Sequence, residues 1–243
     1  MANGKKTASL TSLLMIFTGP TIRIGTGANC SLFCQRIFFL GINRLKLLDR
    51  QAIKDHHSTG KHTMTATTEY VILVDEEDKE IKLAEKLLVH QQGLLHRAFS
   101  VFIFRTSHET QQIELLLQQR SLSKYHSPLL WTNTCCSHPR KGEDIIKAGE
   151  RRLQEELGIA TTLVSMGSFH YKAHFTNGLC ENEIDHVLVG HVDPDTIIQI
   201  DPTEIHSYRW INLTDLHEEL NNRPEQFTPW LAKALKLISF ANT

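Results

Sequence analysis

Apolar positions gather in short runs from Thr68 onward, separated by polar loops. The runs 70–74, 99–104 and 113–117 are rich in β-branched, aromatic or other apolar residues, which is typical of strands. A polar stretch at 106–112 lies between the last two runs. We therefore predict that these two strands form a hairpin.

The pattern beyond this hairpin predicts a helix at 144–157, then strands at 163–169, 184–192 and 207–211, and finally two helices. This order of elements predicts a mixed α/β fold with antiparallel pairing. Neither an internal repeat nor a low-complexity linker interrupts the pattern. We predict a single domain over residues 64–243.

The start of the final helix is well signalled. Thr228 is the predicted N-cap and Pro229 the first helical residue, ahead of the apolar Trp230, Leu231 and Leu235. We therefore place the beginning of this helix at residue 229.

Residues 1–63 show no sustained strand or helix period and are basic, with no acidic residue before position 49. We predict that they form an extension outside the folded domain. It is either a targeting segment or a disordered tail, or a stretch upstream of a true start at Met64.

Charge and composition exclude several classes of protein. The chain has a net charge of −1, and the six basic residues within 1–48 leave −7 for the remainder, which disfavours nucleic-acid binding. No apolar run approaches the roughly 20 residues that a membrane span needs. Five cysteines, an odd number with one adjacent pair, favour a reducing compartment over a disulfide scaffold. We predict a cytoplasmic protein.

Two short stretches hold candidate chemistry at alternating spacing. Cys136 lies two residues before His138, and Glu181 lies two residues before Glu183. In an extended strand, residues i and i+2 point to the same side. Folded together, these side chains would supply a thiol, an imidazole and two carboxylates to one metal and acid/base centre.

The central helix carries a second pattern, RRLQEELG at 151–158, with Glu143 ahead of it. It resembles a degenerate Nudix box, with Ser137 in place of the first glycine and Arg152 in place of a glutamate of the metal-binding cluster. The resemblance implies the Nudix fold with a weaker case for hydrolysis. Arg152 and Glu156 lie one turn apart and can face the same site, although a surface ion pair would show the same spacing.

Further motifs occur around this helix in a matching order: GLLHRAFS at 93–100, LQQRS at 117–121, TNTCCSHP at 132–139, FHYKA at 169–173, ENE at 181–183 and FTPW at 227–230. Together they resemble type 1 isopentenyl-diphosphate delta-isomerases over residues 69–240. The resemblance implies a Nudix-type α/β/α sandwich with a mixed, partly antiparallel sheet. It also implies the interconversion of isopentenyl and dimethylallyl diphosphate.

The resemblance also assigns roles to individual residues. The catalytic acid and base are Cys136 and Glu183, and Tyr171 is a candidate assistant in proton movement. A first metal site for Mn²⁺, Mg²⁺ or Zn²⁺ maps onto His90, His96, His138, Glu181 and Glu183.

A second ion, Mg²⁺ bridging to the diphosphate, is assigned to Glu156. Contacts to the diphosphate map onto Lys86, Arg120, Lys124 and Arg152. Trp230 is a candidate for the apolar pocket that protects a carbocation from water. The expected partner is the small diphosphate substrate, and a monomer is favoured.

Two other functions stay open at this point. A Nudix diphosphate hydrolase would release phosphate or pyrophosphate and leave Cys136, Glu183 and the histidines without a role. A metal-stabilised binding module would use Cys136, His138 and other histidines to hold a structural zinc ion.

Overall fold

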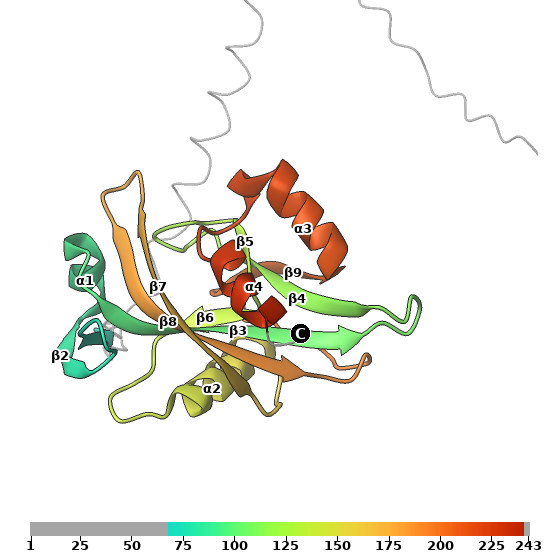
Figure 1. Ribbon diagram of the computed structural model, residues 1–243, viewed down its shortest axis with the longest axis horizontal. Coiled ribbons are helices and arrows are strands. Elements are labelled where there is room, and N and C mark those ends of the chain that lie inside the picture. The colour runs from blue at the N-terminus through green and yellow to red at the C-terminus, as the bar shows by residue number, and fades with distance from the viewer. Residues whose placement is uncertain (1–67, 241–243) are drawn as a thin grey trace, which may run out of the picture. The chain divides into compact units, whose positions relative to one another are not determined.

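The computed structural model describes residues 68–240 (Figure 1). The prediction of an extension at residues 1–63 lies outside this described part. None of the helices within it is long and apolar enough to cross a membrane.

Within residues 68–240, nine strands form one mixed sheet. They are β1 (Tyr70–Val74), β2 (Glu80–Glu85), β3 (His96–Thr106), β4 (Ile113–Arg120), β5 (Trp131–Thr132), β6 (Cys135–Ser137), β7 (Val164–His174), β8 (Cys180–His191) and β9 (Ile205–Asn212). The helices are α1 (Lys86–Gln92), α2 (Ile145–Leu157), α3 (Leu213–Asn222) and α4 (Leu231–Phe240), with a 3₁₀ turn at Pro224–Gln226.

Strand β3 is the centre of the sheet. It pairs antiparallel with β1, β4 and β6 and parallel with β8. Strand β8 continues into an antiparallel hairpin with β7, and β4 pairs antiparallel with β9. The predicted β3–β4 hairpin and the predicted mixed class are confirmed.

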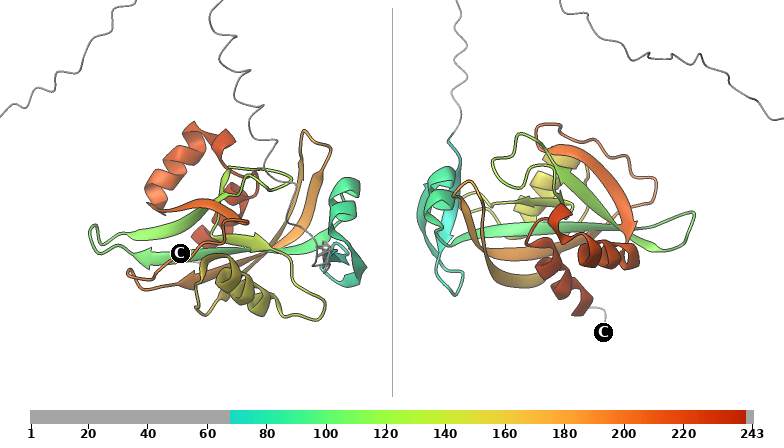
Figure 2. Two further views of the ribbon diagram at one scale, coloured as in Figure 1. Left: turned by 180° about the vertical axis from the view of Figure 1, so that it is seen from behind. Right: turned by 90° about the horizontal axis from the view of Figure 1, so that it is seen from above.

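Both faces of β3 are apolar, because helices cover both sides of the sheet. Phe99, Val101 and Ile103 pack in one core cluster with residues of α2. Phe102 and Phe104 belong to the opposite cluster, which contains residues of α3 and α4. Figures 1 and 2 show α2 on one face and α3 and α4 on the other, which gives the expected α/β/α sandwich.

Local signals set the limits of α2 close to the prediction. The Asp144 carboxylate caps the helix by accepting hydrogen bonds from the amides of Ile146 (3.0 Å) and Lys147 (3.1 Å). Gly158 ends the helix with φ of 68°, a conformation that favours glycine. The helix therefore presents Arg152 and Glu156 from a fixed position.

Several elements differ from the sequence prediction. Strands β2, β5 and β6 and helix α1 were not predicted, since β2 is largely exposed, β5 and β6 have only two and three residues, and α1 has only seven residues. Helix α4 begins at Leu231, so the predicted start at residue 229 is wrong. The Thr228 hydroxyl donates a hydrogen bond to Thr132 Oγ1 at 2.8 Å.

Gly149 provides a test of the packing between α2 and the sheet. A β-carbon at this position would lie 2.6 Å from Leu188 Cδ1 and 2.9 Å from Leu163 Cδ1. We expect Gly149→Ala to lower the free energy of unfolding by about 1–3 kcal/mol, although alanine is the better helix former. Urea denaturation measures this, with Gln154→Ala at an exposed position of α2 as the control. A Gly149→Ala protein as stable as the wild type would contradict the tight packing.

Candidate active site

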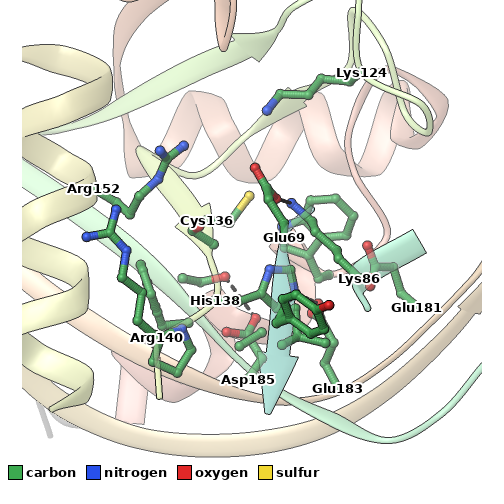
Figure 3. Close-up of a pocket in the computed structure, with 18 of the residues that line it drawn as sticks. Glu69, Lys86, Lys124, Cys136, His138, Arg140, Arg152, Glu181, Glu183 and Asp185 are labelled. Carbon is green, nitrogen blue, oxygen red and sulfur yellow. Dashed lines mark hydrogen bonds and ion pairs between the residues drawn. The ribbon is translucent and has the colours of Figure 1, made fainter. Parts of the chain in front are cut away.

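A polar cavity of about 400 Å³ lies where β3, β6 and β8 meet the loop after β4 and helix α2 (Figure 3). Its walls contain most of the residues predicted from the sequence. These are Lys86, Arg120, Lys124, Cys136, His138, Arg152, Tyr171, Glu181, Glu183 and Trp230.

Histidines and glutamates form a compact cluster beside this cavity. His90 Nε2 lies 3.1 Å from Glu181 Oε2, and His96 Nε2 lies 3.3 Å from Glu183 Oε1. His138 Nε2 lies 3.1 Å from the same Glu183 oxygen. The structure thus brings together all five residues predicted for the first metal site.

The hydrogen bonds on the far side of two rings orient them toward the cluster. His90 Nδ1 donates to the Lys86 carbonyl at 2.6 Å, and His96 Nδ1 donates to the Leu94 carbonyl at 2.9 Å. Because Nδ1 of each ring donates to a carbonyl, Nε2 is the ring nitrogen that faces the cluster. These second hydrogen bonds are typical of histidines that bind metal ions.

The atoms that face one another in the cluster lack donors. Nε2 of His90, Nε2 of His96 and Oε2 of Glu181 are buried and have no hydrogen-bond partner. A cation held between these nitrogen and oxygen atoms would give each of them a partner. One nitrogen or oxygen from each of His90, His96, His138 and Glu183 lies within 4.8 Å of the others. The donor set therefore fits a divalent metal ion.

Both glutamates of the cluster, Glu181 and Glu183, are ionised at pH 7. Burial raises the pKa of Glu181, but contacts with His126 and His90 outweigh it and hold that pKa well below its usual range. For Glu183, burial and the charge of Glu181 raise the pKa, whereas contacts with His138 and His96 lower it and prevail. Burial lowers the pKa of His138 to about 4, so its ring is neutral at pH 7.

Cys136 and Glu183 differ in protonation inside the same cavity. Burial raises the pKa of the Cys136 thiol to about 12, so it holds its proton at pH 7. Tyr171 donates a hydrogen bond of 2.5 Å to Glu183 Oε2, and burial raises the pKa of this phenol well above its usual value. The neighbouring Cys135 is fully buried in the core.

Aromatic rings form part of the cavity wall. The ring centres of Tyr171 and Trp230 lie 6.1 Å apart, and the Arg120 guanidinium lies 5.5 Å from the Trp230 ring centre. The Trp230 indole donates a hydrogen bond to Asn133 Oδ1 at 3.1 Å. Because this bond fixes the indole, the ring presents a stable apolar surface to the cavity.

The cations predicted for a diphosphate lie in the cavity, and three of them pair with carboxylates. Lys86 lies 2.7 Å from Glu69, and Lys124 forms an ion pair with Glu204. Arg152 bridges Glu156 at 2.5 Å and Glu204 at 3.1 Å. Figure 3 shows Lys124 and Arg152 projecting into the same space as Cys136.

Glu156 lies next to Arg152, with which it forms an ion pair. It is buried, and burial raises its pKa although Arg152 opposes the rise. Gln118 Nε2 lies 3.5 Å from its second oxygen. A buried carboxyl group beside cations that suit phosphate is a suitable ligand for a second divalent ion.

Three acidic groups of the cavity were missed from the sequence. Glu69 and Glu204 pair with the predicted cations. Asp185 follows Glu183 by two residues on β8, is buried, and accepts a hydrogen bond from Ser100 Oγ at 2.8 Å. Its alternating spacing after Glu181 and Glu183 was a usable signal, whereas Glu69 and Glu204 lie apart from any motif.

His126 was also missed. Its Nε2 lies 2.7 Å from Glu181 Oε1, and only 5% of the residue is exposed. It follows Lys124 by two residues in the loop after β4, and no alternating pattern marked it as a neighbour of Glu181.

The comparisons with known proteins agree with this fold. A NUDIX domain profile matches residues 94–231, which defines the chain as a Nudix protein. A crystal structure of a Deinococcus radiodurans protein has the same fold at a TM-score of 0.50 and 18% identity. It covers 64% of this chain and 90% of that chain.

More specific matches come from curated bacterial proteins named isopentenyl-diphosphate Delta-isomerase. The protein from Serratia proteamaculans is 48% identical over 69% of this chain and 90% of its own length. That from Photobacterium profundum is 47% identical over 70% of this chain and 94% of its own length. The chain belongs to the isopentenyl-diphosphate Delta-isomerase family.

Glu204 gives a prediction about pH. Burial raises its pKa, but Lys124 and Arg152 outweigh burial and keep the pKa below its usual value. A lowered pKa in the folded state means stability that is present above the ordinary pKa of about 4.3 and lost as the pH falls through the folded value. We expect Glu204→Gln to lower the free energy of unfolding by on the order of 1 kcal/mol at pH 7.

Denaturation in urea at pH 7 and at lower pH measures this gap, which should close as the wild-type carboxylate becomes protonated. Glu109→Gln, at an exposed position in the β3–β4 turn, is the control. A gap that stays constant with pH would contradict the ionic origin of the effect.

Proposed function

We propose that this chain interconverts isopentenyl diphosphate and dimethylallyl diphosphate by proton addition and removal through a tertiary carbocation. The observation that carries the proposal is the protonated Cys136 thiol and the ionised Glu183 carboxylate in one cavity beside a metal-binding donor set. Family membership supports the same reaction.

The reaction needs one proton donor and one proton acceptor. An unactivated alkene takes a proton at its terminal carbon, and the neighbouring methylene then loses one. At pH 7 the Cys136 thiol can donate a proton and the Glu183 carboxylate can accept one. Neither group has to change its protonation state before the reaction begins. Tyr171 holds the Glu183 carboxylate by its hydrogen bond and can help to move a proton.

The carbocation must be kept from water. Tyr171 and Trp230 supply aromatic faces, which stabilise a cation and exclude nucleophiles. The Arg120 guanidinium lies 5.5 Å from the centre of the Trp230 ring.

The diphosphate would be held by Lys86, Arg120, Lys124 and Arg152. Three of these cations pair with carboxylates in the structure, which keeps them ordered before the substrate arrives. Diphosphate oxygens would replace Glu69 and Glu204 as partners. These basic side chains supply local positive charges that attract the diphosphate, although the protein as a whole is acidic.

His90, His96, His138, Glu181 and Glu183 would hold a Mn²⁺, Mg²⁺ or Zn²⁺ ion, and Glu156 would hold Mg²⁺ with the diphosphate. These ions would supply positive charge that favours proton transfer and binds phosphate oxygens. The chain's own part is to present imidazole nitrogens and ionised carboxylates at fixed positions.

Arg152 distinguishes this proposal from diphosphate hydrolysis. The guanidinium occupies the position of a metal-binding glutamate of the Nudix box and pairs with Glu156. A cation there removes one ligand of the cluster that activates water in the hydrolases. In the isomerase reaction, in contrast, Cys136 and Glu183 would transfer the two protons.

The test is incubation of the purified protein with isopentenyl diphosphate in deuterated water containing Mg²⁺ and Mn²⁺. NMR should show dimethylallyl diphosphate with deuterium in a methyl group. Release of phosphate or pyrophosphate without this product would overturn the isomerase in favour of the hydrolase. A folded protein that binds metal and changes neither compound would indicate a binding module.

Substitution of the acid/base pair tests the roles of its members. We expect Cys136→Ala and Glu183→Gln each to lower kcat by at least about 100-fold, because each removes a group that transfers a proton. Cys180→Ala is the control, since Cys180 does not line the cavity. Steady-state kinetics measure the effect, and thermal unfolding checks the fold. Wild-type activity in either of the first two variants would refute the assignment.

The single domain over 64–243, the cytoplasmic location and the monomeric state stay predictions from the sequence.

A further inference from the structure

In both glutamates of the metal-binding cluster, one carboxylate oxygen faces histidines of the predicted metal site and the other contacts a side chain outside that site. Glu183 directs Oε1 to His96 and His138, while Oε2 accepts the hydrogen bond from Tyr171. Glu181 directs Oε2 to His90 at 3.1 Å, while Oε1 lies 2.7 Å from His126 Nε2.

His126 is held by contacts independent of Glu181. Its ring stacks on Phe175 with centres 4.6 Å apart, and its carbonyl accepts a hydrogen bond from Arg120 Nη2 at 3.2 Å. Ser127 Oγ lies 3.4 Å from Nδ1 and can donate to it, which leaves the proton on Nε2, facing Glu181. The ring therefore meets the carboxylate as a donor in a fixed place.

A carboxylate without such a partner rotates or binds a cation through both oxygens. One occupied oxygen leaves the other as a single, oriented ligand. Oε2 of Glu181 is buried and has no hydrogen-bond partner, as expected of an oxygen reserved for a cation.

We propose that His126 is a positioning residue of the metal site, which fixes the Glu181 carboxylate through Oε1 so that Oε2 faces the ion. It does for Glu181 what Tyr171 does for Glu183. His126, His90 and Glu181 also form a group whose ligand atoms lie within 4.8 Å of one another, so direct ligation by His126 is the competing arrangement.

Two substitutions separate these arrangements. His126→Phe keeps a flat ring against Phe175 but has no donor, whereas His126→Gln places an amide N–H near the position of Nε2. The metal-free proteins are titrated with Mn²⁺ alone by isothermal calorimetry. We expect a loss of affinity of about 10- to 100-fold for His126→Phe and near wild-type affinity for His126→Gln.

His174→Ala, which removes an exposed histidine at the end of β7, is the matched control and should bind Mn²⁺ as the wild type does. Thermal unfolding of the metal-free proteins checks that the variants are folded. If His126→Phe does not fold, His126→Ala removes the same donor and takes its place.

Wild-type affinity in the donor-less variant would overturn the role of His126. Equal losses in the phenylalanine and glutamine variants would also overturn it, in favour of direct ligation. This inference rests on the metal site of the proposed function, but its readout involves no substrate. A wild-type protein that binds Mn²⁺ without isomerising substrate would overturn the activity alone, and one that binds no metal would overturn the site and this role together.

Discussion

The parallel register between β3 and β8 is the constraint on which the cavity depends. It places His96 beside Glu183, and the β7–β8 hairpin places Tyr171 on the other side of the same glutamate. A shift by one residue would turn Glu181 and Glu183 to the opposite face of the sheet. The apolar packing on both faces of β3 prevents such a shift, because it would exchange the residues that face α2 and α4. The hydrophobic core thus fixes the position of the polar site.

Burial next to this core carries a free-energy cost for the polar site. Buried imidazoles and carboxylates lose hydration, and several of their atoms have no hydrogen-bond partner. The cations across the cavity are paired with acidic side chains, so the protein itself balances the charges in that half. The histidine half instead contains buried atoms without a hydrogen-bond partner, and its donor set fits a cation. In the proposed function, metal binding would stabilise the fold, and substrate binding would exchange one set of anionic partners for another.

The sequence predicted those parts of the site that depend on local geometry. Alternation along a strand correctly placed Glu181 with Glu183, and helical spacing correctly placed Arg152 near Glu156. His126 and Glu204 were not predictable in this way, because loops bring them to partners 55 and 80 residues away, as the pairs His126–Glu181 and Lys124–Glu204 show. Helix α1 was missed because seven residues are too few for a clear period, although it carries both Lys86 and His90.

In the proposed reaction, the differing protonation of Cys136 and Glu183 supplies one proton donor and one proton acceptor. Both groups are removed from water, which by itself would make both neutral. Glu183 stays ionised because His96, His138 and Tyr171 contact its two oxygens. Burial dominates for Cys136, whose Sγ lies 3.8 Å from Arg120 Nη1, so its pKa is raised and it keeps its proton. The same burial therefore yields a donor and an acceptor, and the difference lies in the number of polar contacts to each group.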